Sequence, residues 1–267
     1  MARLDIAVAV STMSGFRVAP RVGHLDRLKR IVGCPVKMKH GFIRVRTEEP
    51  DFSDLPSQPQ DWSHTVYGKV TEMLPTDAPK PLGKPVVFTT YVDANLYHDY
   101  VTGRAVTGVL HYINQTPFDW YTKKQATVET ATYGSEFVAA KTAVQQIIGH
   151  RCTLRYLGVP VKGSTKMFGD NESVVTSSTM PDSPLKKRHH ALSYHFTREA
   201  IASNAVDFHH IPGTMNPADV LSKHWGYAQV WKTLKAVLFW AGDTADLFLD
   251  GFPATDPMED EPVGSDK

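Results

Sequence analysis

The sequence is poor in cysteine and contains no long apolar run. Only two of its 267 residues are cysteines, Cys34 and Cys152, which excludes a disulfide framework and a cysteine-rich zinc site. No stretch approaches the roughly 18–20 apolar residues of a membrane span, and the first ten residues lack the apolar core of a secretory signal. We therefore expect an intracellular protein, cytoplasmic or nuclear, without a membrane partner.

The net charge is also small, at +1, and taken alone it argues against a nucleic-acid partner. Its distribution is uneven. Residues 1–47 carry +8 and residues 86–242 carry +4, whereas residues 48–85 carry −4 and residues 243–267 carry −7. The positive charge of these two segments is offset in the total by the acidic linker and tail. Such a distribution is compatible with binding to a phosphate backbone. The alternative is a solvated surface followed by a disordered acidic tail.

The order of predicted elements indicates an α/β fold with a mixed sheet. Two short helices are predicted at 4–13 and 22–32, and seven prolines between 48 and 85 indicate a linker. The remaining pattern predicts strands at 86–92, 106–113, 118–121, 164–169 and 206–211, and helices at 133–148, 191–203, 216–223 and 227–240. Three sequential strands followed by alternating strands and helices favour a mixed sheet covered by helices.

Four acidic residues occupy equivalent places in this pattern. Asp93 ends the first predicted strand of the sheet, and Asp170 ends the fourth. Glu136 and Asp219 lie in the first turns of helices. Strand ends and helix starts meet at one edge of such a sheet, where ligand sites form. The alternative for each acid is a solvated or capping role, and Asp170 would then cap a helix over 171–177.

Four carboxylates in one place would repel one another unless they shared cations. Hard oxygen ligands favour Mg²⁺, or else Mn²⁺. Two such ions about 4 Å apart can activate a water and stabilise the leaving oxygen in phosphodiester cleavage. The pattern therefore makes Asp93, Glu136, Asp170 and Asp219 candidates for both metal ligands and catalytic residues.

Seven sequence blocks carry a family resemblance. They are YVDA at 91–94, TGRAVTG at 102–108, WYTKKQ at 120–125, TYGSEF at 132–137, GDN at 169–171, RHHALSYHFTRE at 188–199 and NPADVLSK at 216–223. In this order they closely resemble the ribonuclease H domain of copia-type retrotransposon polyproteins. The resemblance covers about residues 86–225.

The resemblance implies a ribonuclease H-like fold with a central five-stranded mixed sheet. It implies hydrolysis of the RNA strand of an RNA–DNA hybrid with two Mg²⁺ ions, held by the four acids named above. The upstream partner would be a reverse-transcriptase domain. The chain then divides into a reverse-transcriptase remnant, a Pro-rich linker, the ribonuclease H-like domain, a C-terminal helix and a disordered acidic tail, at 1–47, 48–85, 86–225, 226–245 and 246–267.

Two other interpretations remain. The chain can be an inactive retroelement remnant or a nucleic-acid-binding module, or it can be an integrase-like nuclease of the same fold. Integrases typically use three acids with a glutamate last, whereas the last acid here is Asp219. A polymerase reading of YVDA requires a second aspartate where this chain has Ala94, so we expect no DNA synthesis.

Basic side chains near the predicted site are candidates for phosphate contacts, with a solvated surface as the alternative. They are Arg104, Lys123, Lys124, Lys186, Lys187 and Arg188. His210 is a candidate proton shuttle, because imidazole carries protons near neutral pH. A zinc site is conceivable from the number of histidines, at 189, 190, 195, 209 and 210. We expect none, because no cysteine lies near and the resemblance offers no such site.

Overall fold

The computed structural model describes residues 3–37, 43, 45–56 and 60–224. The predicted C-terminal helix at 226–245 and the acidic tail at 246–267 lie outside the described residues. No helix in the described part of the chain is both long and apolar enough to cross a bilayer.

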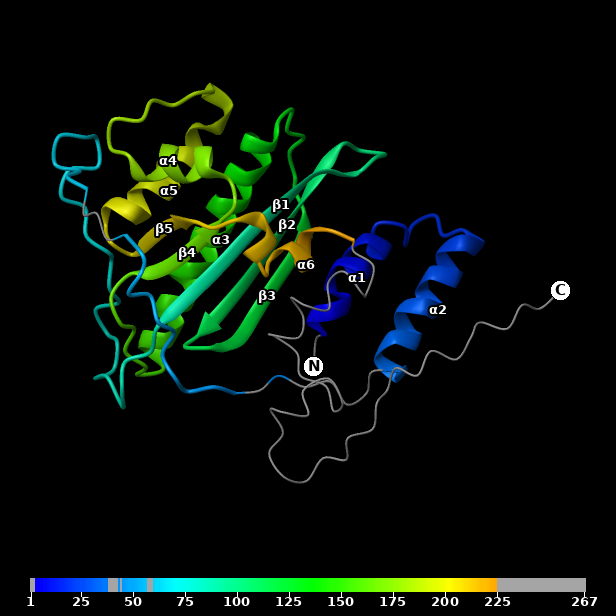
Figure 1. Ribbon diagram of the computed structural model, residues 1–267, viewed down its shortest axis with the longest axis horizontal. Helices are drawn as coiled ribbons and strands as arrows, with labels where there is room; N and C mark the ends of the chain where they lie inside the picture. Colours follow the sequence, from blue (N-terminus) through cyan, green and yellow to red (C-terminus); the bar gives the residue numbers. More distant parts are fainter. Residues whose placement is uncertain (1–2, 38–42, 44, 57–59, 225–267) are drawn as a thin grey trace.

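A five-stranded mixed sheet forms the centre of the molecule (Figure 1). Its order is β3-β2-β1-β4-β5, with β1 to β3 antiparallel and β4 and β5 parallel to β1. The strands are rich in the β-branched and aromatic residues that suit a pleated surface. They span Phe88–Asp99, Arg104–Ile113, Thr116–Lys124, Thr165–Gly169 and Val206–His210. The predicted mixed sheet is confirmed.

The first strand is longer than the sequence predicts. We expected it to end at Asp93, but β1 continues to Asp99 and places Asp93 in its middle. The segment after Asp93 lacks an apolar run, so its own pattern gave no signal. It is extended because it pairs with β2, with Asp93 opposite Gly108 and Asp99 opposite Arg104. Tertiary pairing therefore overrides a weak local preference.

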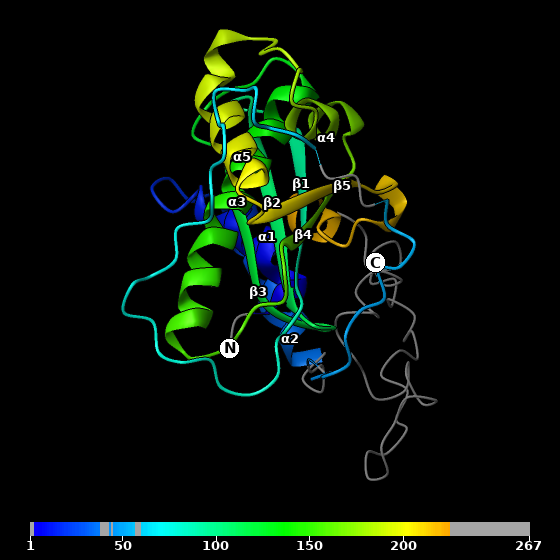
Figure 2. The same ribbon diagram turned by 90° about the vertical axis from the view of Figure 1, so that its left-hand side faces the viewer.

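Three helices cover one face of the sheet, as Figures 1 and 2 show. They are α3 (Thr132–Tyr156), α4 (Glu172–Thr179) and α5 (Ala191–Ala202). The main hydrophobic core lies beneath them and includes Phe88, Phe137, Ile147 and Met167, all fully buried. The helix predicted at 133–148 thus extends to Tyr156, two residues before Gly158, whose positive φ of 74° ends it.

The opposite face is covered by short elements from the two ends of the described chain. These are η1 (Leu4–Ile6) and α1 (Ala7–Ser14) from the N-terminal end, and α6 (Asp219–Ser222) from the C-terminal end. The short turn η3 (Gly213–Met215) comes before α6. Leu4 is 1 % exposed and packs with Leu110 and Leu221 in a second core cluster. Beyond α1 lies α2 (Val22–Lys37) (Figure 1). The division of the chain into domains remains a prediction, but Leu4 belongs to the packing of this sheet.

The Pro-rich segment 48–85 contains no helix or strand among its described residues. Its first part lies on the other face, where the Phe52 ring is 5.7 Å from that of Phe168, and its later part runs along the helical side (Figure 2). Individual side chains hold this later part in place. Trp62 is buried, and the guanidinium of Arg198 lies 4.7 Å from the centre of its ring. Glu72 binds Arg151 and Arg155 of α3 through two oxygens. The linker predicted here is therefore packed against the domain.

Candidate metal centre

Three of the four predicted acids converge. One carboxylate oxygen each from Asp93, Glu136 and Asp170 lies within 4.8 Å of the other two. Strand register explains the meeting of the two aspartates, because Tyr91 of β1 pairs with Phe168 of β4 and each acid follows its paired residue by two positions. Glu136 comes from the second turn of α3, which packs on the sheet beside β1.

The capping alternative for Asp170 is wrong. Asn171 is the N-cap of α4, and its Oδ1 accepts a hydrogen bond of 3.2 Å from the N–H of Val174. Asp170 is thereby left to point its carboxylate toward the other acids. The loop before α6 also approaches it closely, since a Cβ at Gly213 would lie 3.1 Å from its Oδ2.

Burial gives this cluster unusual electrostatics. The Asp93 side chain is 1 % exposed, and burial raises its pKa to about 6, against the opposing effects of Lys223 and Ser222. Burial also raises the pKa of Glu136 well above its usual range, and the neighbouring charges of Asp93 and Asp170 raise it further. A divalent cation would relieve this repulsion.

Asp219 is connected to this cluster by two residues of the same segment, Ser222 and Lys223, which contact Asp93. Lys223 binds Asp219, and its Nζ lies 3.4 Å from Oδ1 of Asp93. The Ser222 hydroxyl donates a hydrogen bond to the other oxygen of Asp93. Asp219 is not one of the three converging acids, but its charge acts on Asp93.

The sequence reasoning assigned no role to Ser222, Lys223 or Asn216. The side-chain amide of Asn216 is buried and donates to the carbonyl oxygen of Val92 at 2.9 Å, which fixes the start of the α6 segment beside β1. The available signal was the i,i+4 spacing of Asp219 and Lys223, which puts opposite charges on one side of a helical turn.

Gly108 lets α6 approach the sheet. A Cβ at this position would lie 2.8 Å from the carbonyl oxygen of Ala218 and 2.9 Å from Leu221. Since Gly108 is also the strand partner of Asp93, the segment carrying Asp219 is packed directly beside that acid. Only glycine allows this backbone approach.

We expect Gly108→Ala to lower the free energy of unfolding by about 1–3 kcal/mol, because the added methyl group must displace backbone atoms of α6. Urea denaturation measures the loss. The control is Gly149→Ala in α3, where a Cβ meets nothing within 4 Å and alanine favours the helix. Equal stability of the two variants would contradict this account of the packing.

The basic candidates lie on both sides of the N-terminal end of α3. Lys123 and Lys124 end β3, and the next residue, Gln125, donates to the carbonyl oxygen of Ser135 beside Glu136. Lys186 lies 5.0 Å from the ring centre of Tyr133, with Lys187 and Arg188 exposed after it.

Lys124 is already paired with Asp99, and this contact lowers the pKa of the Asp99 carboxyl. Arg104 is exposed at the start of β2. Their contacts with nucleic acid remain predictions.

His210 lies beside the carboxylate cluster. It is exposed at the end of β5, and its Nε2 is 3.2 Å from the backbone carbonyl oxygen of Asp170. Its role as a proton shuttle remains a prediction. The neighbouring His209 is instead buried, with Nε2 3.0 Å from a carboxylate oxygen of Asp207.

The three converging acids fit divalent cations with oxygen ligands. Ligand oxygens around one Mg²⁺ lie about 3–4 Å apart, because each bond is roughly 2.1 Å long. Oxygens that bind two neighbouring ions can lie farther apart than this. Separations of up to 4.8 Å therefore require only small side-chain movements. The donor set contains oxygen alone, which Mg²⁺ and Mn²⁺ prefer.

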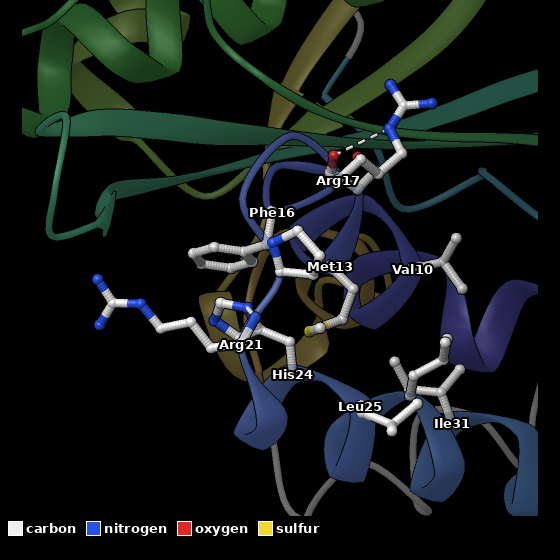
Figure 3. A pocket seen from close by; sticks show the side chains of 11 residues that line it. Val10, Met13, Phe16, Arg17, Arg21, His24, Leu25 and Ile31 are labelled. Atoms are coloured by element: carbon white, nitrogen blue, oxygen red, sulfur yellow. Dashed lines mark hydrogen bonds between the residues drawn. The ribbon is translucent and has the colours of Figure 1, made fainter.

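A separate cavity lies between α1 and α2 (Figure 3). It has a volume of about 470 Å³, and most of its walls are apolar side chains such as Met13, Leu25 and Ile31. The rings of Phe16 and His24 stack at one end, 4.1 Å apart. None of the described residues that line it is acidic, so the cavity offers no carboxylate ligands for a cation.

Comparison with known proteins supports the resemblance. The retrovirus-related Pol polyprotein of transposon TNT 1-94 from Nicotiana tabacum is 26 % identical over 141 residues, which are 53 % of this chain and 10 % of the polyprotein. That of transposon RE1 from Arabidopsis thaliana is 24 % identical over 221 residues, 83 % of this chain and 13 % of the polyprotein. The relatives of this chain are retrovirus-related Pol polyproteins. It spans only about a tenth of their length, and no protein-family model matches it.

The solved structures to which this chain is similar include ribonuclease H domains. LC11-RNase H1 in complex with an RNA/DNA hybrid is 17 % identical and covers 55 % of this chain and 99 % of its own, with a TM-score of 0.41. The N-terminal RNase H domain of a Mycobacterium tuberculosis protein is 12 % identical and covers 57 % of this chain and 98 % of its own, also with a TM-score of 0.41. The five-stranded mixed sheet with flanking helices agrees with the predicted ribonuclease H-like fold.

Proposed function

We propose that this chain is a metal-dependent endonuclease that cleaves the RNA strand of RNA–DNA hybrids during retrotransposon reverse transcription. The observation that carries the proposal is the convergence of Asp93, Glu136 and Asp170 from three separate elements. Its relatives are transposon Pol polyproteins, which supports a role beside a reverse-transcriptase domain. No DNA synthesis is expected of this chain.

Asp93, Glu136, Asp170 and Asp219 would hold two Mg²⁺ ions. When bound, such ions supply an activated water and stabilise charge on the phosphate. Lys223 lies between Asp93 and Asp219 and contacts both carboxylates, which orients them. His210 would move a proton at the edge of the site, and its contact with the backbone of Asp170 supports this role.

Binding would depend on the shape and backbone of the hybrid. Proteins distinguish RNA from DNA through the 2′-hydroxyl, and phosphate contacts position the duplex without reading its sequence. The exposed basic residues around the N-terminal end of α3 support such contacts, with Lys186, Lys187 and Arg188 on one side and Lys123 on the other.

A cleavage assay on four substrates tests the proposal. The full chain is incubated with end-labelled RNA–DNA hybrid, duplex DNA, duplex RNA and single-stranded RNA, with Mg²⁺ or with EDTA. We expect cuts within the RNA strand of the hybrid alone, and none in EDTA. Cleavage of duplex DNA would favour the integrase-like alternative. Hybrid binding without cleavage would identify an inactive binding module.

A further inference from the structure

A second cluster of potential metal ligands lies beside the start of α3. Glu129 follows β3, and His189 and His190 belong to the turn η2 (Arg188–His190). Oε2 of Glu129 lies 3.5 Å from Nε2 of His190 and 3.7 Å from Nε2 of His189. The three donor atoms all lie within 4.8 Å of one another.

A ring nitrogen of His190 points into this cluster, is buried, and lacks a hydrogen-bond partner among the described residues. Its side chain is 4 % exposed, and that of Glu129 is 6 % exposed. Nε2 of His190 has no hydrogen-bond partner in the part of the chain that the structure describes. A buried nitrogen without a hydrogen-bond partner lowers the stability of the folded state, and a bound ion can supply the missing partner.

The backbone leaves room for the donors at Gly134. A Cβ at this position would lie 2.5 Å from Oε2 of Glu129 and 3.0 Å from Nε2 of His190. These are the two atoms that face each other in the cluster. A methyl group at this position would displace both atoms, so glycine leaves the space in which the two donors face each other.

We propose that Glu129, His189 and His190 bind a Zn²⁺ ion. With bonds of 2.0–2.2 Å, donors around a tetrahedral zinc lie about 3.4 Å apart, close to the two distances observed here. Imidazole nitrogens suit Zn²⁺ better than Mg²⁺, which separates this site from the all-oxygen cluster. His189 is 59 % exposed, so the remaining coordination position opens toward solvent.

The prediction of no zinc site rested on the lack of a nearby cysteine and on the family resemblance. It did not include Glu129, which the fold brings to η2 from the segment after β3. An ion at this site would tie that segment to η2 at the N-terminal end of α3. It would thereby fix the position of the neighbouring basic residues 186–188.

The other histidine cluster is a weaker candidate. His111, Asp119 and His150 also lie within 4.8 Å of one another. Both ring nitrogens of His111 are already hydrogen-bonded, Nδ1 to Thr90 at 2.9 Å and Nε2 to Gln146 at 3.1 Å. His111 therefore has no nitrogen left for a metal, and His150 provides a matched control.

Zinc titration of the full chain tests the proposal. The protein is stripped with EDTA, dialysed into excess Mg²⁺ to fill the carboxylate cluster, and titrated with Zn²⁺ against a chromophoric chelator. We expect one Zn²⁺ per chain, and a visible absorption band when Co²⁺ replaces it. His189→Gln should weaken binding at least about 100-fold, since altering residues that merely support ligands typically costs 10- to 100-fold. Gly134→Ala should weaken it similarly, although all three donors remain.

The controls separate this site from other binding. His189 is exposed, so its variant should melt at the wild-type temperature without metal even if Gly134→Ala does not fold. His150→Gln should bind Zn²⁺ as the wild type does. The proposal is overturned if the wild type binds no Zn²⁺, if His189→Gln binds it undiminished, or if His150→Gln alone loses it. None of these readouts depends on nuclease activity.

Discussion

Replacing Asp93 by asparagine is expected to abolish hybrid cleavage and to make the metal-free chain more stable. Loss of a carboxylate ligand removes several kcal/mol of transition-state stabilisation, which corresponds to at least about a 1000-fold lower rate. The stability gain has a separate cause. Burial raises the folded-state pKa of Asp93 above its unfolded value, so the ionised form opposes folding at neutral pH.

The sign of this effect follows from the direction of the shift. A raised pKa means that stability is greatest below the unfolded pKa and falls as pH rises through the folded one. Asparagine is neutral throughout and escapes this penalty, which we expect to be worth about 1–3 kcal/mol at pH 7. Lys223 keeps Asp219 as its partner in the variant.

Urea denaturation in EDTA and a cleavage assay in Mg²⁺ check the two effects on the same protein. Mg²⁺ should raise the melting temperature of the wild type, but raise that of Asp93→Asn much less. The control is Asp182→Asn, whose side chain is 90 % exposed and should change neither property. If Asp93→Asn cleaves within tenfold of the wild type, Asp93 is not a metal ligand.

Removing the negative charge of Glu72 is expected to cost about 3 kcal/mol of stability at neutral pH. This carboxylate receives two hydrogen bonds of 2.7–2.8 Å from Arg151 and two of 2.7 Å from Arg155. The Arg151 side chain is only 3 % exposed, so Glu72→Gln leaves a buried guanidinium without its counter-charge. The variant should also release the Pro-rich segment from α3.

The effect of Glu72 should depend on pH. Burial by itself would raise its pKa, but the bonds from Arg151 and Arg155 outweigh burial and lower it to about 2. The stabilisation is therefore complete above the unfolded pKa of about 4.5 and is lost as pH falls toward 2. Urea denaturation of wild type and Glu72→Gln from pH 7 to pH 3 should show the two curves approaching each other.

Glu49→Gln is the matched control for Glu72. Glu49 binds Lys162 at 2.7 Å, but both side chains are about half exposed, and such surface pairs contribute about 1 kcal/mol or less. Equal losses in the two variants would mean that Glu72 does not fasten the segment 48–85 to the domain.

The elements of the sheet were predictable because their signals are local. Apolar and β-branched runs predicted five strands, and helical spacing predicted α3 and α5. The limits of β1 were not predictable, because its second half is held by pairing with β2 and not by its own composition. The same holds for α6, which is one short turn fixed by Asn216 and by contact with Gly108.

The sequence by itself determined which acids are present, which strands and helices carry them, and which family the chain resembles. Only the tertiary structure decided that Asp93, Glu136 and Asp170 meet, and that Lys223 lies between Asp93 and Asp219. It also decided that Glu72 binds α3 and that Glu129 faces His190. Apart from the Lys223–Asp219 pair, each of these contacts joins residues far apart in the chain. Their strength comes from burial and close approach, which no local pattern of residues contains.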